Sequence, residues 1–86
     1  MLAPEQSRAA RGWLGWTQAD LAERARVSLS TIKSFESGER TPIINNLNAL
    51  ERALADAGIR LAFAKDGKAI GIAFEGSPSR VAGQSK

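Results

Sequence analysis

The chain has 86 residues, of which 43% are hydrophobic and 24% are charged, a composition typical of a single globular domain. It contains no cysteine and no histidine, which excludes disulfides, thiolate nucleophiles and sulfur-ligated zinc and removes the commonest general base. A formal charge of +3 and a pI of about 10.0 favour a polyanionic partner without identifying it. No apolar run is long enough to span a membrane and no signal-peptide pattern is present, so we expect a cytoplasmic protein.

The first predicted helix runs from Pro4 to Arg11. Proline suits the first turn of a helix, and Gly12 is expected to end this one. A loop containing Gly12 and Gly15 should follow.

Residues 17–37 carry the start signals of two short helices in succession. Thr17 is placed to cap the first helix, with Asp20 completing an approximate capping box, and Ser28 is placed to cap the second. The two helices abut across residues 25–27. Two short helices joined by such a turn form a helix-turn-helix, whose second helix can enter the major groove of DNA.

The second of these helices is predicted to be amphipathic. With Ile32 pointing inward, Phe35 and Glu36 fall within about 60° of it on a helical wheel. The opposite face is small and polar, and it consists of Ser30, Lys33, Ser34 and Ser37.

A fourth helix is predicted from Pro42, with Thr41 as its cap, to about Asp56. Gly38 suits the left-handed position after the preceding helix, and Thr41-Pro42 reads as a cap followed by proline in the first helical position. Its apolar residues recur at spacings of three and four: Ile43, Leu47, Leu50 and Leu54. Gly58 is expected to end it.

After Gly58 apolar residues alternate along the chain, which predicts two strands. Asp66-Gly67 indicates a two-residue type I′ turn between them. Folding about that turn pairs six apolar residues on one face: Ile59 with Phe74, Leu61 with Ile72, and Phe63 with Ile70.

An isolated hairpin is marginal in water, so we predict that this apolar face forms a dimer interface. The alternative, that the face covers the chain's own helices, stays open, and both can hold. The predicted organisation is a helix-turn-helix domain over residues 1–57, a dimerisation hairpin over 58–75 and a disordered tail over 76–86.

A specific set of residues lies between positions 11 and 54. It comprises Arg11, the run Gly15-Trp16-Thr17-Gln18-Ala19-Asp20-Leu21-Ala22, Val27-Ser28, Thr31-Ile32, Phe35-Glu36, Gly38, Arg40, Pro42 and Leu47. With this set, the segment resembles the helix-turn-helix of the phage lambda repressor and Cro superfamily, also called the XRE family. The resemblance implies a mainly α fold, with a four-helix lambda-repressor-like domain to which this chain adds a C-terminal β-hairpin.

The resemblance also implies roles for individual residues. Arg11 and Glu36 match a family ion pair that orients the recognition helix, and Ala22 fills a position reserved for a small residue. Where the family often has glycine in the interhelical turn, this chain has Arg26, which would be strained in a left-handed conformation. Trp13 and Trp16 are expected to pack in the core or the loop rather than to stack on bases.

The DNA-contacting residues implied by the resemblance lie at the two helix starts and along the second helix. They are Thr17, Gln18, Ser28, Leu29, Ser30, Lys33, Ser34 and Arg40. Gln18 stands at a helix N-terminus that suits phosphate, and Lys33 and Arg40 are assigned to phosphate or, alternatively, to solvated surface. Ser28 can be a cap instead of a base reader, and Leu29 can be partly core or can meet a thymine methyl group. Because serine contacts discriminate weakly between bases, we expect specificity to be modest or based on DNA shape.

The leading hypothesis is a sequence-specific regulator that binds double-stranded DNA, acting as a homodimeric repressor that reads an inverted repeat through the helix at 29–36. Such a protein would be cytoplasmic and associated with the nucleoid. An antitoxin that represses its own operon and binds a toxin protein is the main alternative, since some antitoxins of this superfamily end in a strand that pairs across a dimer. A protein-interaction adaptor is a third.

An enzyme is disfavoured on the residues alone. The sequence has no phosphate loop and no metal-ligand cluster, and its carboxylates form no paired acid-base arrangement. The carboxylates considered are Asp20, Glu23, Glu36 and Glu39. We therefore expect no catalytic residues, no metal, no cofactor and no membrane partner.

Overall fold

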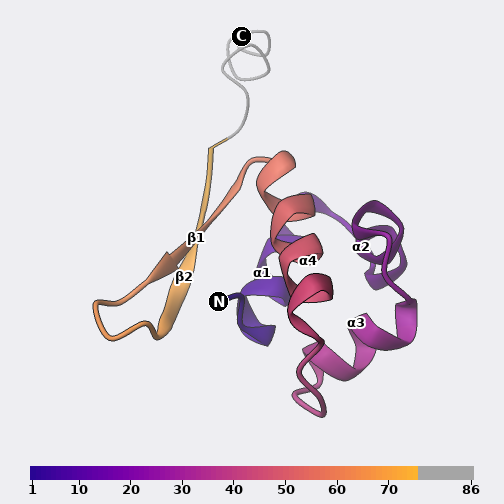
Figure 1. Cartoon of the computed structure of the whole chain (residues 1–86). Helices are drawn as coiled ribbons and strands as arrows, with labels where there is room; N and C mark the ends of the chain where they lie inside the picture. Colours follow the sequence, from indigo (N-terminus) through magenta and orange to yellow (C-terminus); the bar gives the residue numbers. More distant parts are fainter. Residues whose placement is uncertain (76–86) are drawn as a thin grey trace, which may run out of the picture.

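The computed structural model describes residues 1–75, and it contains four helices followed by an antiparallel pair of strands (Figure 1). The elements are α1 (Pro4–Leu14), α2 (Gln18–Ala25), α3 (Leu29–Glu36), α4 (Ile44–Asp56), β1 (Ile59–Phe63) and β2 (Ala69–Phe74). The mainly helical fold with a C-terminal hairpin is thus confirmed. The tail predicted over 76–86 lies outside the described residues.

Helix α1 is longer than the sequence predicts. It continues through Gly12 to Leu14 and ends at Gly15, which has a left-handed φ of 72°. The amide of Trp16 then donates to the carbonyl of Arg11 at 2.9 Å. A single exposed glycine inside a helix costs only about 1 kcal/mol relative to alanine, whereas a left-handed glycine ends the helix, so the second glycine and not the first sets the boundary.

The predicted caps of α2 and α3 are confirmed. Thr17 Oγ1 accepts from the amide of Asp20 at 3.0 Å, and the Asp20 carboxylate accepts from the amide of Thr17 at 2.9 Å. Ser28 Oγ accepts from the amide of Thr31 at 3.2 Å. Between the two helices Arg26 has φ 60° and ψ 42°, the left-handed conformation considered from the sequence.

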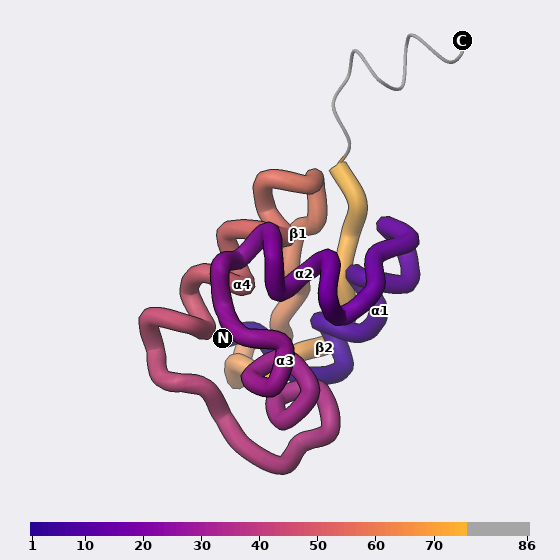
Figure 2. The backbone as a smooth tube through the Cα atoms, turned by 90° about the vertical axis from the view of Figure 1, so that its right-hand side faces the viewer, coloured from indigo at the N-terminus to yellow at the C-terminus, as the bar shows by residue number. Residues whose placement is uncertain are grey.

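One apolar core holds the four helices together. Figure 2 shows α2 and α3 next to each other, with α4 on one side and α1 on the other. The largest fully buried apolar side chains come from α2, α3 and α4: Leu21, Ile32, Leu47, Leu50 and Leu54. Ile59 at the start of β1 joins the same core, so the hairpin is attached to the helices from its first residue.

The predicted start of α4 is wrong. The helix begins at Ile44, with Ile43 as its N-cap residue and no side-chain cap, and Ile43 is 67% exposed instead of buried. At the end of α3 the amide of Arg40 donates to the carbonyl of Ser34 at 3.2 Å. Residues 41–43 then connect to α4 in a non-helical conformation.

The turn of the hairpin also differs from the prediction. A type I′ turn needs positive φ at both central residues, and here Gly67 has φ 91° whereas Asp66 is not among the residues with positive φ. The turn is closed instead by Gly67 N donating to Ala64 O at 2.9 Å and Ala64 N donating to Lys68 O at 2.8 Å. It is the longer type of hairpin loop, with glycine at the left-handed position.

The longer loop changes the register beside it. The pairs Ile59 with Phe74 and Leu61 with Ile72 are confirmed, but Phe63 faces Ala69 and the predicted pair of Phe63 with Ile70 is wrong. The register shifts between Ala62 and Phe63, so β2 carries one extra residue at this point. Ile70 leaves the shared apolar face and is 66% exposed.

The apolar face of the hairpin packs against the chain's own helices. Leu61, Ile72 and Phe74 lie against the core, with α4 beside β1 and α1 beside β2. Gln6 of α1, which is 2% exposed, holds both strands through its side-chain amide. Its Nε2 donates to Ala62 O at 3.0 Å and to Gly71 O at 2.9 Å.

The strained turn residue gives a testable prediction. Replacing Arg26 by glycine should raise the free energy of unfolding by about 1 kcal/mol, because glycine adopts the left-handed conformation without the cost that arginine carries. Urea unfolding followed by circular dichroism measures the change. As a control, Arg52→Gly in the exposed middle of α4 should lower it by about 1 kcal/mol. A loss of stability in Arg26→Gly as large as that of the control would refute the strain.

Candidate nucleic-acid interface

Helix α3 is amphipathic in the way the sequence predicts. Ile32, Phe35 and Glu36 are buried on its inner side. On its outer side Ser30 and Lys33 are exposed, and Ser34 is half-buried at the edge. This helix therefore offers a small, polar face to solvent while its other face is fixed to the core.

The buried carboxylate of Glu36 ties α3 to the first two helices. It accepts from Arg11 Nη2 at 2.7 Å and from Arg11 Nε at 2.9 Å, which confirms the ion pair implied by the resemblance. It also accepts from Ser7 Oγ at 2.5 Å and from Gln18 Nε2 at 3.2 Å. Arg8 Nη1 donates to the backbone carbonyl of Glu36. Sequence reasoning missed Ser7, although it stands four residues before Arg11 and so on the same face of α1.

This cluster keeps Glu36 ionised. Burial, the largest single influence, would raise the pKa of Glu36, but the hydrogen bonds from Arg11, Ser7 and Gln18 and the charge of Arg11 together hold it below its usual value. The hydrogen bond from the Arg11 guanidinium to Glu36 likewise raises the pKa of Arg11. Arg11, Ser7 and Gln18 therefore hold the carboxylate of Glu36 in place on the inner side of α3, and we call these four residues the clamp.

The candidate residues at the helix starts have partners of their own. The hydroxyls of Thr17 and Ser28 are exposed but serve as caps, and Ser28 also contacts Thr31 Oγ1 at 2.7 Å. The side chain of Gln18 turns toward Glu36 and donates to its carboxylate from Nε2. Leu29 is 38% exposed and thus belongs partly to the solvent face.

Three of the candidate residues meet at one hollow of about 290 Å³ beside α3. Ser30 and Ser34 line it from α3, and Arg40 lines it from the loop that follows. Lys33 is exposed and, like Arg40, has no ion pair among the described residues. Asn46 of α4 also lines the hollow, a residue that sequence reasoning did not single out because it gives no signal beyond its place near a helix start.

The two tryptophans differ in their surroundings. Trp16 packs against the core and lies under Arg24, whose guanidinium carbon is 4.4 Å from the ring centroid. Trp13 is 65% exposed, so the expectation that it would be buried is wrong for this residue. Its ring is 5.7 Å from that of Phe74, because the extension of α1 past Gly12 carries it over β2.

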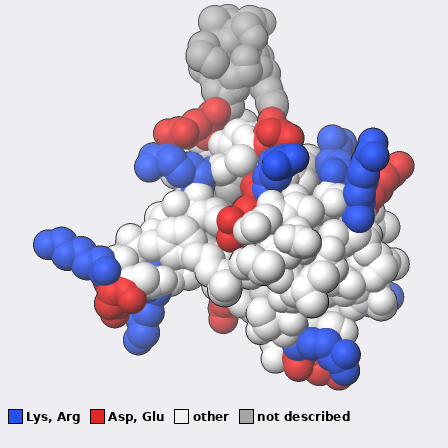
Figure 3. Space-filling view, viewed as in Figure 1, with Lys and Arg blue, Asp and Glu red and all other residues white. Residues whose placement is uncertain are grey.

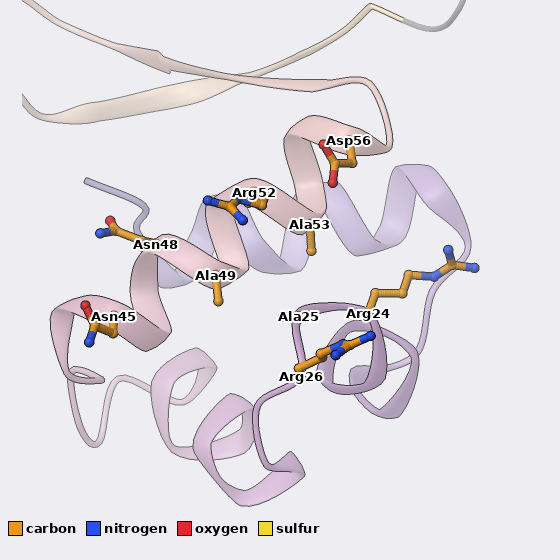
Figure 4. Close-up of a pocket in the computed structure, with 9 residues that line it drawn as sticks. All are labelled: Arg24, Ala25, Arg26, Asn45, Asn48, Ala49, Arg52, Ala53 and Asp56. Carbon is orange, nitrogen blue, oxygen red and sulfur yellow. The ribbon is translucent and has the colours of Figure 1, made fainter.

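A second groove, of about 470 Å³, lies between α2 and α4 (Figure 4). Ala49 and Ala53 point toward α2, whereas the side chains of Arg24 and Arg52 extend in opposite directions. The cations of this groove do not converge on one point, so it lacks the arrangement of an anion site.

Residues 1–75 contain neither a candidate metal site nor a candidate membrane span. No group of three acidic side chains that could hold a metal ion occurs in this part of the chain. None of its helices is both long enough and apolar enough to cross a membrane. Figure 3 shows the charged side chains gathered around the edges of one face, with uncharged residues between them.

Two short helices, the second of them buried on one side and polar on the other, define a DNA-binding helix-turn-helix protein. The helix-turn-helix family profile matches residues 8–55, more than half of the chain, and the chain belongs to this family, in its XRE-type branch. The protein is therefore a DNA-binding transcription regulator, and its family is not an enzyme family. No curated protein matches the chain.

The clamp beneath α3 predicts a dependence of stability on pH. The pKa of Glu36 is lowered in the folded state, so its contribution is complete above the unfolded value of 4.5 and is lost as the pH falls through the folded value. Glu36→Gln should cost about 3 kcal/mol at pH 7, because Arg11 loses its partner, and should flatten the decline of stability below about pH 5. Urea unfolding between pH 3 and pH 7 measures both effects.

Glu39→Gln is the matched control, since Glu39 is exposed in the loop after α3. It should leave both the stability at neutral pH and the acid decline nearly unchanged. Equal pH profiles for wild type and Glu36→Gln would contradict the role assigned to the clamp.

Proposed function

We propose that this protein is a homodimeric transcriptional repressor that reads an inverted-repeat operator through the outer face of α3. The observation that carries the proposal is that α3 has a polar face open to solvent and an opposite face fixed to the rest of the protein. Ser30 and Lys33 face solvent, while Glu36 on the opposite side is clamped by hydrogen bonds from α1 and α2. A helix held in this way can enter the major groove without being reordered on binding.

The side chains on and next to α3 fall into two groups, one suited to DNA phosphates and the other suited to base edges. Lys33 and Arg40, which have no ion pair within residues 1–75, fit backbone phosphates, and the first amides of α2 offer a positive helix end for a further phosphate. Ser30, Ser34 and Leu29 would meet base edges, with the leucine placed for a thymine methyl group. Thr17 and Ser28 would contribute mainly as caps that set where each helix starts.

Dimerisation through the hairpin is supported by the apolar side chains that it leaves uncovered. Ile59, Leu61 and Ile72 are used against the chain's own core, but Ile70 is 66% exposed. Phe63 is half-buried, and Trp13 on α1 is exposed beside Phe74, at the other end of β2 from Ile70. A twofold dimer would set two copies of α3 about 34 Å apart, in successive major grooves.

The same exposed apolar residues support a second candidate function. An antitoxin needs a surface for its toxin protein in addition to its DNA-binding helix, and exposed Trp13 and Ile70 are the kind of side chains that protein interfaces use. Co-purification with the product of an adjacent, co-transcribed gene, lost in Trp13→Ser, would favour this candidate. A complex with that product that forms equally well with Trp13→Ser would argue against this surface.

DNA binding measured against salt tests the α3 assignment. Wild type should bind duplex DNA with a linear log-log salt dependence, and Lys33→Ala should reduce the slope by about 0.9, the value for one phosphate contact. Ser34→Ala should leave the slope unchanged but broaden the sequences selected from a random duplex pool. An adaptor that does not bind DNA would show no binding in either assay, and unchanged slope and selection in both variants would refute the assignment.

The oligomeric state tests the hairpin assignment. Ile70→Asp should shift the protein from dimer to monomer in sedimentation equilibrium, because a carboxylate would be buried without a partner at the proposed interface. The fold should survive, since Ile70 is exposed in the single chain. Ile44→Asp, at a 57% exposed position on α4, is the control and should stay dimeric. A dimer that tolerates Ile70→Asp would place the interface elsewhere.

A further inference from the structure

We infer that the turn between β1 and β2 is a second DNA-contacting element, in which Lys65 and Lys68 bind backbone phosphates beside the phosphate bound by Arg40. The inference rests on the proposed binding of DNA by α3. It extends that interface beyond the helix-turn-helix to a part of the chain that lies outside the family match over residues 8–55.

The turn and the loop after α3 border one hollow of about 350 Å³. Gly67 and Ala69 line it from the hairpin, Gly38, Arg40 and Thr41 line it from the loop, and residues 1–4 border it as well. In Figure 1 the turn lies at the left of the molecule and the loop at its bottom. A duplex that reaches Arg40 and extends across this hollow would meet the turn.

The charges of the hairpin are distributed so that the turn is its basic end. Lys65 and Lys68 are exposed, and neither has an ion pair among residues 1–75. At the other end Arg60 is paired with Glu75, Nε to Oε2, at 2.9 Å. Asp66 lies between the lysines, and its Oδ1 accepts from the amide of Lys68 at 3.0 Å. Figure 3 shows basic side chains projecting from the tip of the hairpin.

The turn is also held in place relative to α3. Gln6 of α1 binds the carbonyls of Ala62 and Gly71, one on each strand. The next residue of α1, Ser7, donates to the carboxylate of Glu36 on α3. Because both links come from one helix, the strands that carry the turn and the recognition helix are both attached to α1, which lowers the cost of ordering them when both meet DNA.

Lysine at this position fits phosphate better than bases. Its ammonium group is a compact, strongly hydrated charge on a flexible chain, which binds phosphate as a point charge and carries little base specificity. The turn should therefore increase affinity and salt dependence for any sequence, and leave reading to α3.

The experiment compares two double variants with the same loss of charge. Lys65→Ala with Lys68→Ala, and Arg52→Ala with Arg60→Ala, each lower the net charge from +3 by two. Binding of a random-sequence DNA duplex is titrated between about 50 and 200 mM salt. The lysine variant should lose up to about 1.8 units of log-log slope and bind roughly tenfold or more weakly at about 100 mM salt, whereas the arginine variant should lose much less.

Hydroxyl-radical footprinting on a selected duplex adds a positional readout. Wild type should protect phosphates that the lysine double variant leaves open, while protection along the α3 site is retained. Equal slopes for the two double variants, or identical footprints for wild type and the lysine variant, would overturn the inference. Lys33→Ala in the same titration separates the two proposals. If Lys33→Ala lowers the slope but the lysine double variant does not, α3 binds DNA and the turn does not. If wild type binds no DNA, the proposed function itself is refuted.

Discussion

The structure depends on one buried carboxylate. Glu36 lies on the core side of α3 at 3% exposure and would be costly there without partners. Arg11, Ser7 and Gln18 supply hydrogen bonds from α1 and α2, so one side chain joins three helices. Such a bond network gives little net stability but specifies one orientation, which is what a helix that must fit a groove requires.

Much of this arrangement could be predicted because it depends on residues that are close together in the sequence. Thr17 and Ser28 cap helices through amides three residues away, and the spacing of Ile32 and Phe35 alone indicates which face they share. The partner of Glu36 needed more than periodicity, since Arg11 lies 25 residues earlier in the chain and only the family pattern points to it. The set of residues that touch DNA remains a prediction.

The elements that were predicted wrongly are those at which a local motif allows more than one backbone solution. The Thr41-Pro42 pattern suggests an earlier start for α4, but Arg40 N donates to Ser34 O and the helix begins at Ile44. The register beyond Ala62 depends on a turn longer than Asp66-Gly67 suggests. In both cases the hydrogen bonds join residues three to six positions apart, and nothing in the residue types distinguishes the two solutions.

Helix α1 contributes no residue to the proposed reading face and yet connects the parts that do. Gln6 holds the hairpin and Ser7 holds α3, so neighbouring residues of one helix set the position of both. If the hairpin carries both the dimer contact and a phosphate contact, the distance between two recognition helices is set through these two side chains. A displacement of the hairpin would therefore act on α3 through Gln6, which bonds the strands, and through Ser7, which bonds Glu36. Both residues are far from α3 in sequence.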